Sequence, residues 1–199
     1  KDGAAGPGDH VHPGVVGDEH LERVRRIRLF HHRLLLPGIE RAVADGNRAY
    51  WFNGSSSGFA ATERTVQAPD TVSVEAWFRT TNGFGKIVGF GNSNTGSSSV
   101  HDRSIYMDNS GRVIFGVGDN HSQHRGTIRT DGMYRDDNWH HVVATLGPAG
   151  MALYIDGQSV GDLAAGSQFA GVGPNYYGYW RIGGDTSWSG GSGYFNGYI

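Results

Sequence analysis

The sequence predicts an all-β protein built as an antiparallel two-sheet sandwich, and three observations support this fold class. From residue 49 onward, eight or nine short segments rich in β-branched and aromatic residues alternate with Gly, Asn, Asp and Ser. No helical period interrupts them. Glycine reaches 33 of 199 residues and aromatic residues reach 12%, which suits tight turns and aromatic-rich strands.

The individual strands follow from alternation between the two faces of a sheet. In TVSVEAWFRTT, the side chains of Val72, Val74, Ala76 and Phe78 share one face. RSIYMDNSGRVIFGVG is predicted as a hairpin that turns at residues 109–111. The other strands are predicted in AYWFNG, GKIVGFGNS, HRGTIRT, NWHHVVATL, MALYIDG, YGYWRIGGD and GYFNGYI.

The stretch DNWHHVVATLGPAGMALYIDG contains two adjacent histidines that suggest a metal or catalytic site. In a strand, however, His140 and His141 point to opposite faces, so one metal ion does not easily take both rings. No HExxH arrangement is present. We therefore expect packed rings that hydrogen-bond to the backbone.

Residues 1–41 form an atypical His/Arg-rich N-terminal segment. Residues 10–41 contain half of the chain's 10 histidines, and EHLERVRRIRLFHHRLLL has only a ragged apolar stripe. The segment reads either as a basic arm that binds anions or as a linker, and the linker is favoured because charge runs are usually solvated.

The composition of the chain limits the kinds of partner and site that we expect. The formal net charge is −2 and the pI is near 6.6, so no global field attracts nucleic acid. The chain has no cysteine, which excludes disulfides and thiolate metal sites. No apolar run approaches the length of a membrane span, and no signal peptide is visible, so we expect no membrane insertion.

The order VEAWF, RSIYMDNSGRVIFGV, WHHVVATLGPAGMALYIDG, YWRIGGD and SGYFNG resembles the laminin G-like (concanavalin A-like) jelly-roll domain, in its bacterial form. The resemblance covers residues 42–199 and implies an extracellular or cell-surface location. Asp156-Gly157 supplies the positive-φ pair that a tight hairpin requires. The family continues with an Asp-Glu-containing strand after SGYFNGYI, so the domain is expected to be truncated at its last strand.

Catalysis is not expected from these residues. Glycoside hydrolases of this fold class need two carboxylates that flank the scissile bond. From residue 42 onward the only glutamates are Glu63 and Glu75, and no Glu-x-Asp-x-x-Glu pattern occurs. A Gly-x-Ser-x-Gly elbow is also absent. The sequence therefore predicts no catalytic residue.

Ligand binding is the better prediction. The segment NYYGYWRIGGDTSWSGGSGYF gathers aromatic rings among glycines, and such rings stack on sugar faces while polar neighbours bind hydroxyls. Its expected ligand contacts are Tyr177, Tyr179 and Trp188, with Trp180 nearer the core. A second polar cluster offers Asp102, Arg103 and Asn120, although solvated turns are the favoured interpretation of these residues.

The family resemblance also implies one structural Ca²⁺ at a rim. Oxygen ligands near Gly-rich turns suit this hard ion, and the candidates by position are Asn53, in FNGS, and Asp185, in GGD. No Asp-x-Asp-x-Asp-Gly loop occurs, and Asn53 has the alternative of an Asx turn.

The predicted function is a non-catalytic module of a secreted or surface bacterial protein. It is expected to bind a glycan or an extracellular protein through rim loops, beside neighbouring domains of a larger chain. Two alternatives remain open: a glycoside-hydrolase-like domain with a carboxylate pair in a cleft, and a structural spacer that packs on a catalytic domain through a flat apolar patch.

Overall fold

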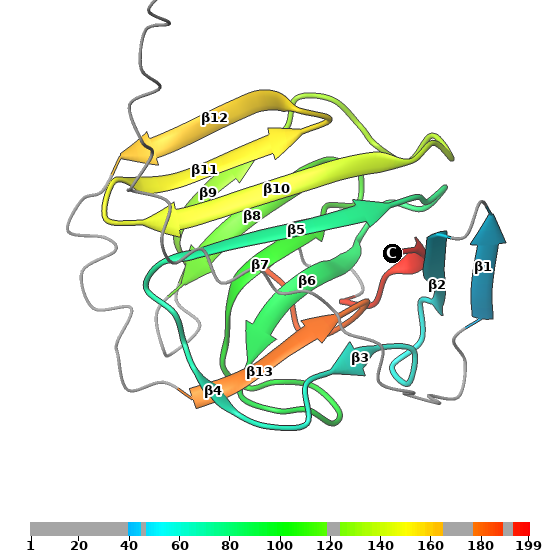
Figure 1. The fold of residues 1–199 in the computed structure, drawn as a ribbon, viewed down its shortest axis with the longest axis horizontal. Coiled ribbons are helices and arrows are strands. Elements are labelled where there is room, and N and C mark those ends of the chain that lie inside the picture. Colours follow the sequence, from blue (N-terminus) through cyan, green and yellow to red (C-terminus); the bar gives the residue numbers. More distant parts are fainter. Residues whose placement is uncertain (1–39, 45–46, 119–123, 165–176, 189–192) are drawn as a thin grey trace, which may run out of the picture.

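The computed structural model describes residues 40–44, 47–118, 124–164, 177–188 and 193–199. Within these ranges the chain forms strands and turns, and no helix there is long and apolar enough to cross a membrane. Two antiparallel sheets lie face to face, with the four-stranded sheet above the seven-stranded sheet in Figure 1. The predicted fold class is confirmed.

The four-stranded sheet contains the β10–β11 hairpin at its centre. Its strands, in spatial order, are β12 (Gln158–Ala164), β11 (Gly150–Ile155), β10 (His140–Gly147) and β5 (Val72–Phe78). The turn after β11 places Asp156 at φ 52° and Gly157 at φ 77°, as predicted for a tight hairpin.

The seven-stranded sheet is built around three strands that are buried at every position, β6 (Gly85–Gly91), β7 (His101–Met107) and β8 (Val113–Gly118). The spatial order is β3-β13-β6-β7-β8-β9, and β4 also pairs with β13. The remaining strands are β3 (Ala60–Ala61), β4 (Val66–Gln67), β9 (His124–Arg129) and β13 (Tyr177–Ile182).

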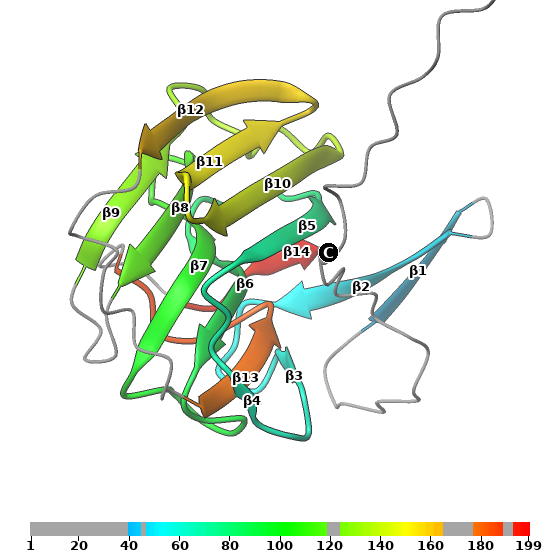
Figure 2. The same ribbon diagram turned by 60° about the vertical axis from the view of Figure 1, so that its left-hand side comes forward.

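A third, three-stranded sheet joins the two ends of the described chain. It contains β1 (Glu40–Ala44), β2 (Asn47–Asn53) and β14 (Asn196–Tyr198), in the order β1-β2-β14 (Figure 2). A bridge between Arg79 and Tyr198 connects β14 to the end of β5. The last described strand therefore lies between the first strands and the four-stranded sheet.

The core lies between the two large sheets because successive side chains of a strand point alternately toward the facing sheet and away from it. In β5, Val72, Val74 and Phe78 are buried, whereas Glu75 and Trp77 are exposed. The facing sheet contributes Ile105, Met107, Val113, Phe115 and Val117 to the same apolar cluster. This alternation defines an outer face on each sheet, and it is on these outer faces that candidate binding residues lie.

The strands predicted from the sequence are all present, but several others were missed. The missed strands are β1, β3, β4 and β12, which are short or rich in polar residues and Gly. The possible helix in EHLERVRRIRLFHHRLLL lies outside the described residues, as do residues 1–39 of the predicted N-terminal segment.

Candidate functional site

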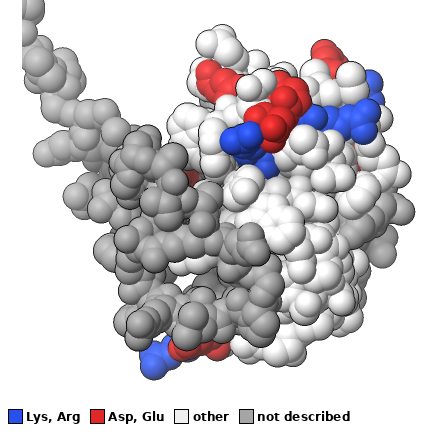
Figure 3. Space-filling model, turned by 90° about the vertical axis from the view of Figure 1, so that its right-hand side faces the viewer, with Lys and Arg blue, Asp and Glu red and all other residues white. Residues whose placement is uncertain are grey.

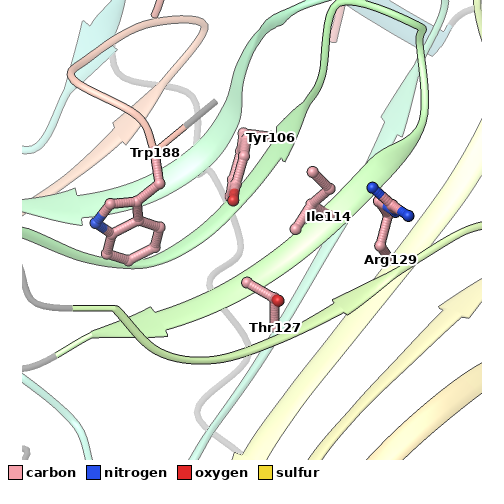
Figure 4. Close-up of a pocket in the computed structure, with 5 residues that line it drawn as sticks. All are labelled: Tyr106, Ile114, Thr127, Arg129 and Trp188. Atoms are coloured by element: carbon pink, nitrogen blue, oxygen red, sulfur yellow. The ribbon is translucent and has the colours of Figure 1, made fainter. Parts of the chain in front are cut away.

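The principal candidate site is a hollow on the outer face of the seven-stranded sheet, over β7, β8 and β9 (Figure 4). It has a volume of about 570 Å³, within the range of small-molecule sites. Five residues line it: Tyr106, Ile114, Thr127, Arg129 and Trp188. We call this set the outer hollow.

Strand register brings four of the five residues together. Tyr106 pairs with Ile114 across β7 and β8, and Ile114 pairs with Arg129 across β8 and β9. Thr127 lies two residues before Arg129 and therefore on the same face. Their chain neighbours, among them Ile105 and Ile128, point into the core.

Trp188 forms the aromatic end of the outer hollow. Its ring centroid lies 4.8 Å from that of His101 and 6.1 Å from that of Tyr106. A Cβ placed on Gly116 would lie 2.8 Å from the indole, so a glycine at this position lets Trp188 lie directly on β8. The half-buried indole thus has a fixed support and an edge toward the hollow.

The polar groups of the outer hollow suit hydrogen bonding to a ligand. Burial raises the pKa of Tyr106 to about 12, with a smaller contribution from Asp108, so its hydroxyl stays protonated at physiological pH. Arg129 is exposed at the opposite end from Trp188 and has no ion-pair partner among the described residues. The arrangement offers an aromatic surface, hydroxyl groups and one guanidinium.

A buried charge cluster supports the segment that carries Trp188. The Asp185 carboxylate accepts hydrogen bonds through Oδ1 from the backbone N–H of Ser98 at 2.8 Å and of Thr186 at 2.7 Å. Its Oδ2 lies 3.7 Å from Lys86 Nζ and 3.7 Å from Arg181 Nε. Asp185, Lys86 and Arg181 are each fully buried.

Titration within this cluster is strongly affected by burial. Desolvation lowers the pKa of Lys86 to about 8, although the Asp185 charge opposes the shift. Desolvation and the neighbouring Lys86 charge lower the pKa of His101 to about 4. The His101 ring beneath Trp188 is therefore neutral at physiological pH.

The structure separates the predicted ligand contacts. Trp188 lies in the outer hollow, whereas Tyr177 and Tyr179 lie on β13, on the other side of β6. Tyr177 is 59% exposed and Tyr179 is half-buried. Trp180 is buried, as predicted. Asn120 lies outside the described residues.

Asp102 and Arg103 lie in the interior rather than on solvated turns, so that expectation was wrong. Both belong to β7, and their side chains form a buried ion pair. Asp102 also accepts a hydrogen bond from the backbone N–H of Gly118 at 2.8 Å, and Arg103 donates to the Pro69 carbonyl at 2.8 Å. The pair ties β7 to β8 and to the segment before β5.

The two metal candidates, Asn53 and Asp185, each have other partners in the structure. Asn53 Oδ1 accepts hydrogen bonds from the backbone N–H of Ser55 at 3.0 Å and from its hydroxyl at 2.7 Å, which is the Asx turn considered above. Asp185 is enclosed by two cations. No group of three or more His, Asp or Glu side chains suited to a metal ion occurs among the described residues. The surroundings of Asp185 do not fit Ca²⁺.

The two histidines of WHHV point to opposite faces, as predicted. His140 is buried, and its Nδ1 and Nε2 lie 2.8 Å from Asp156 and 3.0 Å from Asp136. Its partners are thus carboxylates, and the expected bond to the backbone was wrong. His141 stacks on Trp77 on the outer face, with ring centroids 4.8 Å apart.

Sequence reasoning missed Tyr106, Ile114, Thr127 and Arg129. The signal was present in RSIYM, GRVIF and TIRT, where these residues alternate with the core residues. What was lacking was the register that places the three strands side by side. That register depends on the hairpin turn at Asp108–Gly111 and on the β8–β9 pairing, which includes an irregularity near Gly118.

The fold is similar to that of several solved structures. The mouse laminin alpha1 chain domains LG4-5 match with a TM-score of 0.53 at 17% identity, over 76% of this chain and 39% of that one. The SAP-like pentraxin from Limulus polyphemus matches with a TM-score of 0.51 at 20% identity, over 74% of this chain and 70% of that one. The Ruminococcus gnavus IT-sialidase CBM40 bound to alpha2,3 sialyllactose matches with a TM-score of 0.52 at 17% identity, over 66% and 73%.

This chain spans well under half of the laminin structure that it matches. A comparison with curated proteins gives no match. A laminin G-like family model, described as the concanavalin A-like lectin/glucanases superfamily, matches residues 53–199, which is most of the chain. Together with the two-sheet architecture, this match shows that the chain belongs to the laminin G-like domains of the concanavalin A-like lectin/glucanases superfamily.

Proposed function

We propose that this domain is a non-catalytic, extracellular or cell-surface module that binds a carbohydrate in the outer hollow. The observation that carries the proposal is the indole of Trp188 beside hydroxyl groups and the Arg129 guanidinium, in a hollow of about 570 Å³. The indole offers an apolar contact to the C–H groups of a sugar, while hydroxyl and guanidinium groups bind its oxygen atoms.

The lining of the outer hollow favours binding over hydrolysis. Its five residues include no carboxylate, and the two glutamates considered for catalysis are exposed elsewhere. Glu75 lies on the outer face of the other large sheet, 3.7 Å from His141. The CBM40 structure bound to sialyllactose has a similar fold, which supports the class of ligand for this architecture.

A glycan array tests this proposal, with the Trp188→Ala variant compared with wild type. We expect wild type to bind at least one glycan and the variant to lose about tenfold or more in affinity, because buried aromatic contacts dominate binding energy. Trp77→Ala, which removes a 57% exposed indole from the opposite sheet, is the matched control and should bind normally. Absence of any bound glycan would contradict the proposal.

A protein partner is a second candidate, favoured by exposed and half-buried aromatic residues on the outer face of the four-stranded sheet and on β14. We call Trp77, Trp139, His141 and Tyr198 the aromatic face. Trp77 is 57% and Trp139 41% exposed, and the ring centroids of Trp139 and Tyr198 are 6.2 Å apart. Exposed aromatic clusters are typical of protein interfaces.

The charges at this end of the molecule also suit a protein contact. Arg79 donates two hydrogen bonds of 2.9 Å to Asp137 where β5 ends and β10 begins. Figure 3, which views the side of the molecule that lies to the right in Figure 1, shows positive and negative side chains next to one another. Hydroxyl-radical footprinting of this chain alone and joined to its neighbouring domains tests the idea. Protection of Trp77 and Trp139 only in the longer protein would support the proposal that the aromatic face packs on a neighbouring domain. Equal labelling of the two proteins would contradict that proposal.

A further inference from the structure

The Asp185 carboxylate, which the family resemblance suggests as a ligand for Ca²⁺, lies beside two cationic side chains in this chain. Asp185 Oδ2 is approached by Lys86 Nζ and Arg181 Nε, each at 3.7 Å, and all three side chains are fully buried. Neither Asp185 Oδ2 nor Lys86 Nζ has a hydrogen-bond partner among the described residues. The contact between them is therefore one of charge with charge.

We propose that the Lys86 ammonium takes the place of a metal ion, neutralising Asp185 and so positioning the segment that carries Trp188. Lys86 is thus a positioning residue for the outer hollow. The part of this inference that concerns ligand affinity rests on the proposed function, and the part that concerns the cation does not.

The surroundings of Asp185 are too closely packed to hold a metal ion in addition to Lys86 and Arg181. A Cβ on Gly91 would lie 2.6 Å from Asp185 Oδ2, and one on Gly89 would lie 2.8 Å from Lys86 Cδ. Calcium takes 6–8 oxygen ligands at about 2.3–2.6 Å, whereas Asp185 Oδ2 already has the Lys86 and Arg181 cations beside it, each at 3.7 Å. Adding a divalent ion would place three positive groups around one carboxylate in a desolvated site.

The same carboxylate connects the cluster to Trp188, three residues further along the chain. Asp185 Oδ1 accepts hydrogen bonds from Ser98 and Thr186, and the Thr186 hydroxyl donates to the Ser98 carbonyl at 2.9 Å. Without the Lys86 charge, Arg181 is the one cation left beside Asp185 Oδ2 among the described residues, and the buried carboxylate loses part of its compensation. Loss of the Lys86 charge should therefore disturb the segment from Asp185 to Trp188.

Lysine NMR gives a direct test, because Lys1 and Lys86 are the only lysines of the chain. With ¹³C-lysine labelling, and Lys86→Arg to assign the signals, we expect Lys86 to titrate near pH 8. Asp185→Asn should move this midpoint to lower pH, since the Asp185 charge favours the ammonium. A Lys86 midpoint that is unchanged in Asp185→Asn would overturn the inference, because the Asp185 charge would then not act on the ammonium.

Metal dependence is the second test and requires no variant. We expect millimolar CaCl₂ or EDTA to leave the melting temperature of wild type and the ¹⁹F signal of fluorotryptophan-labelled Trp188 unchanged. The Trp188 signal is assigned by its absence from Trp188→Phe. Stabilisation by Ca²⁺, or a shift of that signal on chelation, would overturn the inference even if glycan binding succeeds.

Substitution of Lys86 completes the design. Lys86→Met should shift the Trp188 ¹⁹F signal and weaken glycan binding about tenfold, whereas Arg79→Met, which breaks an exposed ion pair, should do neither. The Lys86→Met/Asp185→Asn double variant should disturb Trp188 less than the sum of the single variants. Additive effects would contradict the pairing, and the tests on wild type hold even if Lys86→Met fails to fold.

Discussion

His140 illustrates how a single residue is fixed by its neighbours. Its two ring nitrogens are held by Asp156 and Asp136, and the backbone N–H of His141 donates to the second oxygen of Asp156 at 2.7 Å. Asp156 lies in the turn between β11 and β12, so the histidine joins that turn to the segment before β10. A residue that suggests metal chemistry in the sequence thus stabilises the β11–β12 turn.

The His140 cluster predicts a pH dependence. Burial opposes the charge on the imidazole, but hydrogen bonds to Asp156 and Asp136 outweigh it and raise the pKa of His140 above 6.5. A raised pKa stabilises the fold below pH 6.5, and this contribution is lost as the pH rises through the folded value. Urea unfolding should therefore show that His140→Gln destabilises the protein more at pH 5.5 than at pH 8.5.

Asp136→Asn provides the control for this prediction. It removes one of the two carboxylates that favour the charged ring, so the difference between the two pH values should become smaller. An effect of His140→Gln that is the same at both pH values would show that the cluster acts only through packing.

Two glycines with positive φ allow the cost of backbone strain to be compared with the added cost of a steric clash. Gly183 has φ 79° and a Cβ there would lie 2.0 Å from the buried ring of Phe52, whereas Gly157 has φ 77° and no atom within 4 Å. Gly157→Ala should cost about 1–2 kcal/mol for the left-handed backbone alone. Gly183→Ala should cost about 1–3 kcal/mol more, because the core is overpacked.

Urea denaturation of both variants measures this difference, and the slope of the unfolding curve should stay the same. Equal losses of unfolding free energy in the two variants would mean that Phe52 and β13 adjust without cost.

At the scale of the strand, the sequence predicts which side chains share a face, but it does not predict which strands pair or in which register. The faces of β5 and β10 follow directly from TVSVEAWF and HHVVATL. β7 was harder, because His101, Asp102 and Arg103 are buried there by ion pairing and by the Trp188 segment, and neither contact is local in sequence. The outer hollow needed the register of three strands, which alternation alone does not give.

Adjacent valines in β10 test the assignment of faces. Val142 is 0% exposed in the core, whereas Val143 is half-buried on the outer face. Val142→Ala should lower the free energy of unfolding by about 2–3 kcal/mol, since it removes buried methyl groups and leaves a cavity. Val143→Ala should cost about 1 kcal/mol or less. Similar losses, measured by urea denaturation, would contradict the orientation of this strand.

At the scale of the whole molecule, the two large sheets present different chemistry to their surroundings. The outer hollow combines one indole with hydroxyl groups and a guanidinium. The aromatic face on the opposite side combines stacked rings with the Arg79–Asp137 ion pair. A closely packed apolar core separates the two surfaces.

This separation predicts additivity between Trp188→Ala and Trp77→Ala. The two indoles lie on opposite outer faces of sheets whose spacing alone is about 10 Å, and they contact different partners, His101 and His141. Their effects on the free energy of unfolding should therefore add to within about 0.5 kcal/mol in the double variant. Urea denaturation of wild type, both single variants and the double variant measures this sum. A larger deviation, or a loss of glycan affinity in Trp77→Ala, would show that the core transmits strain between the two surfaces.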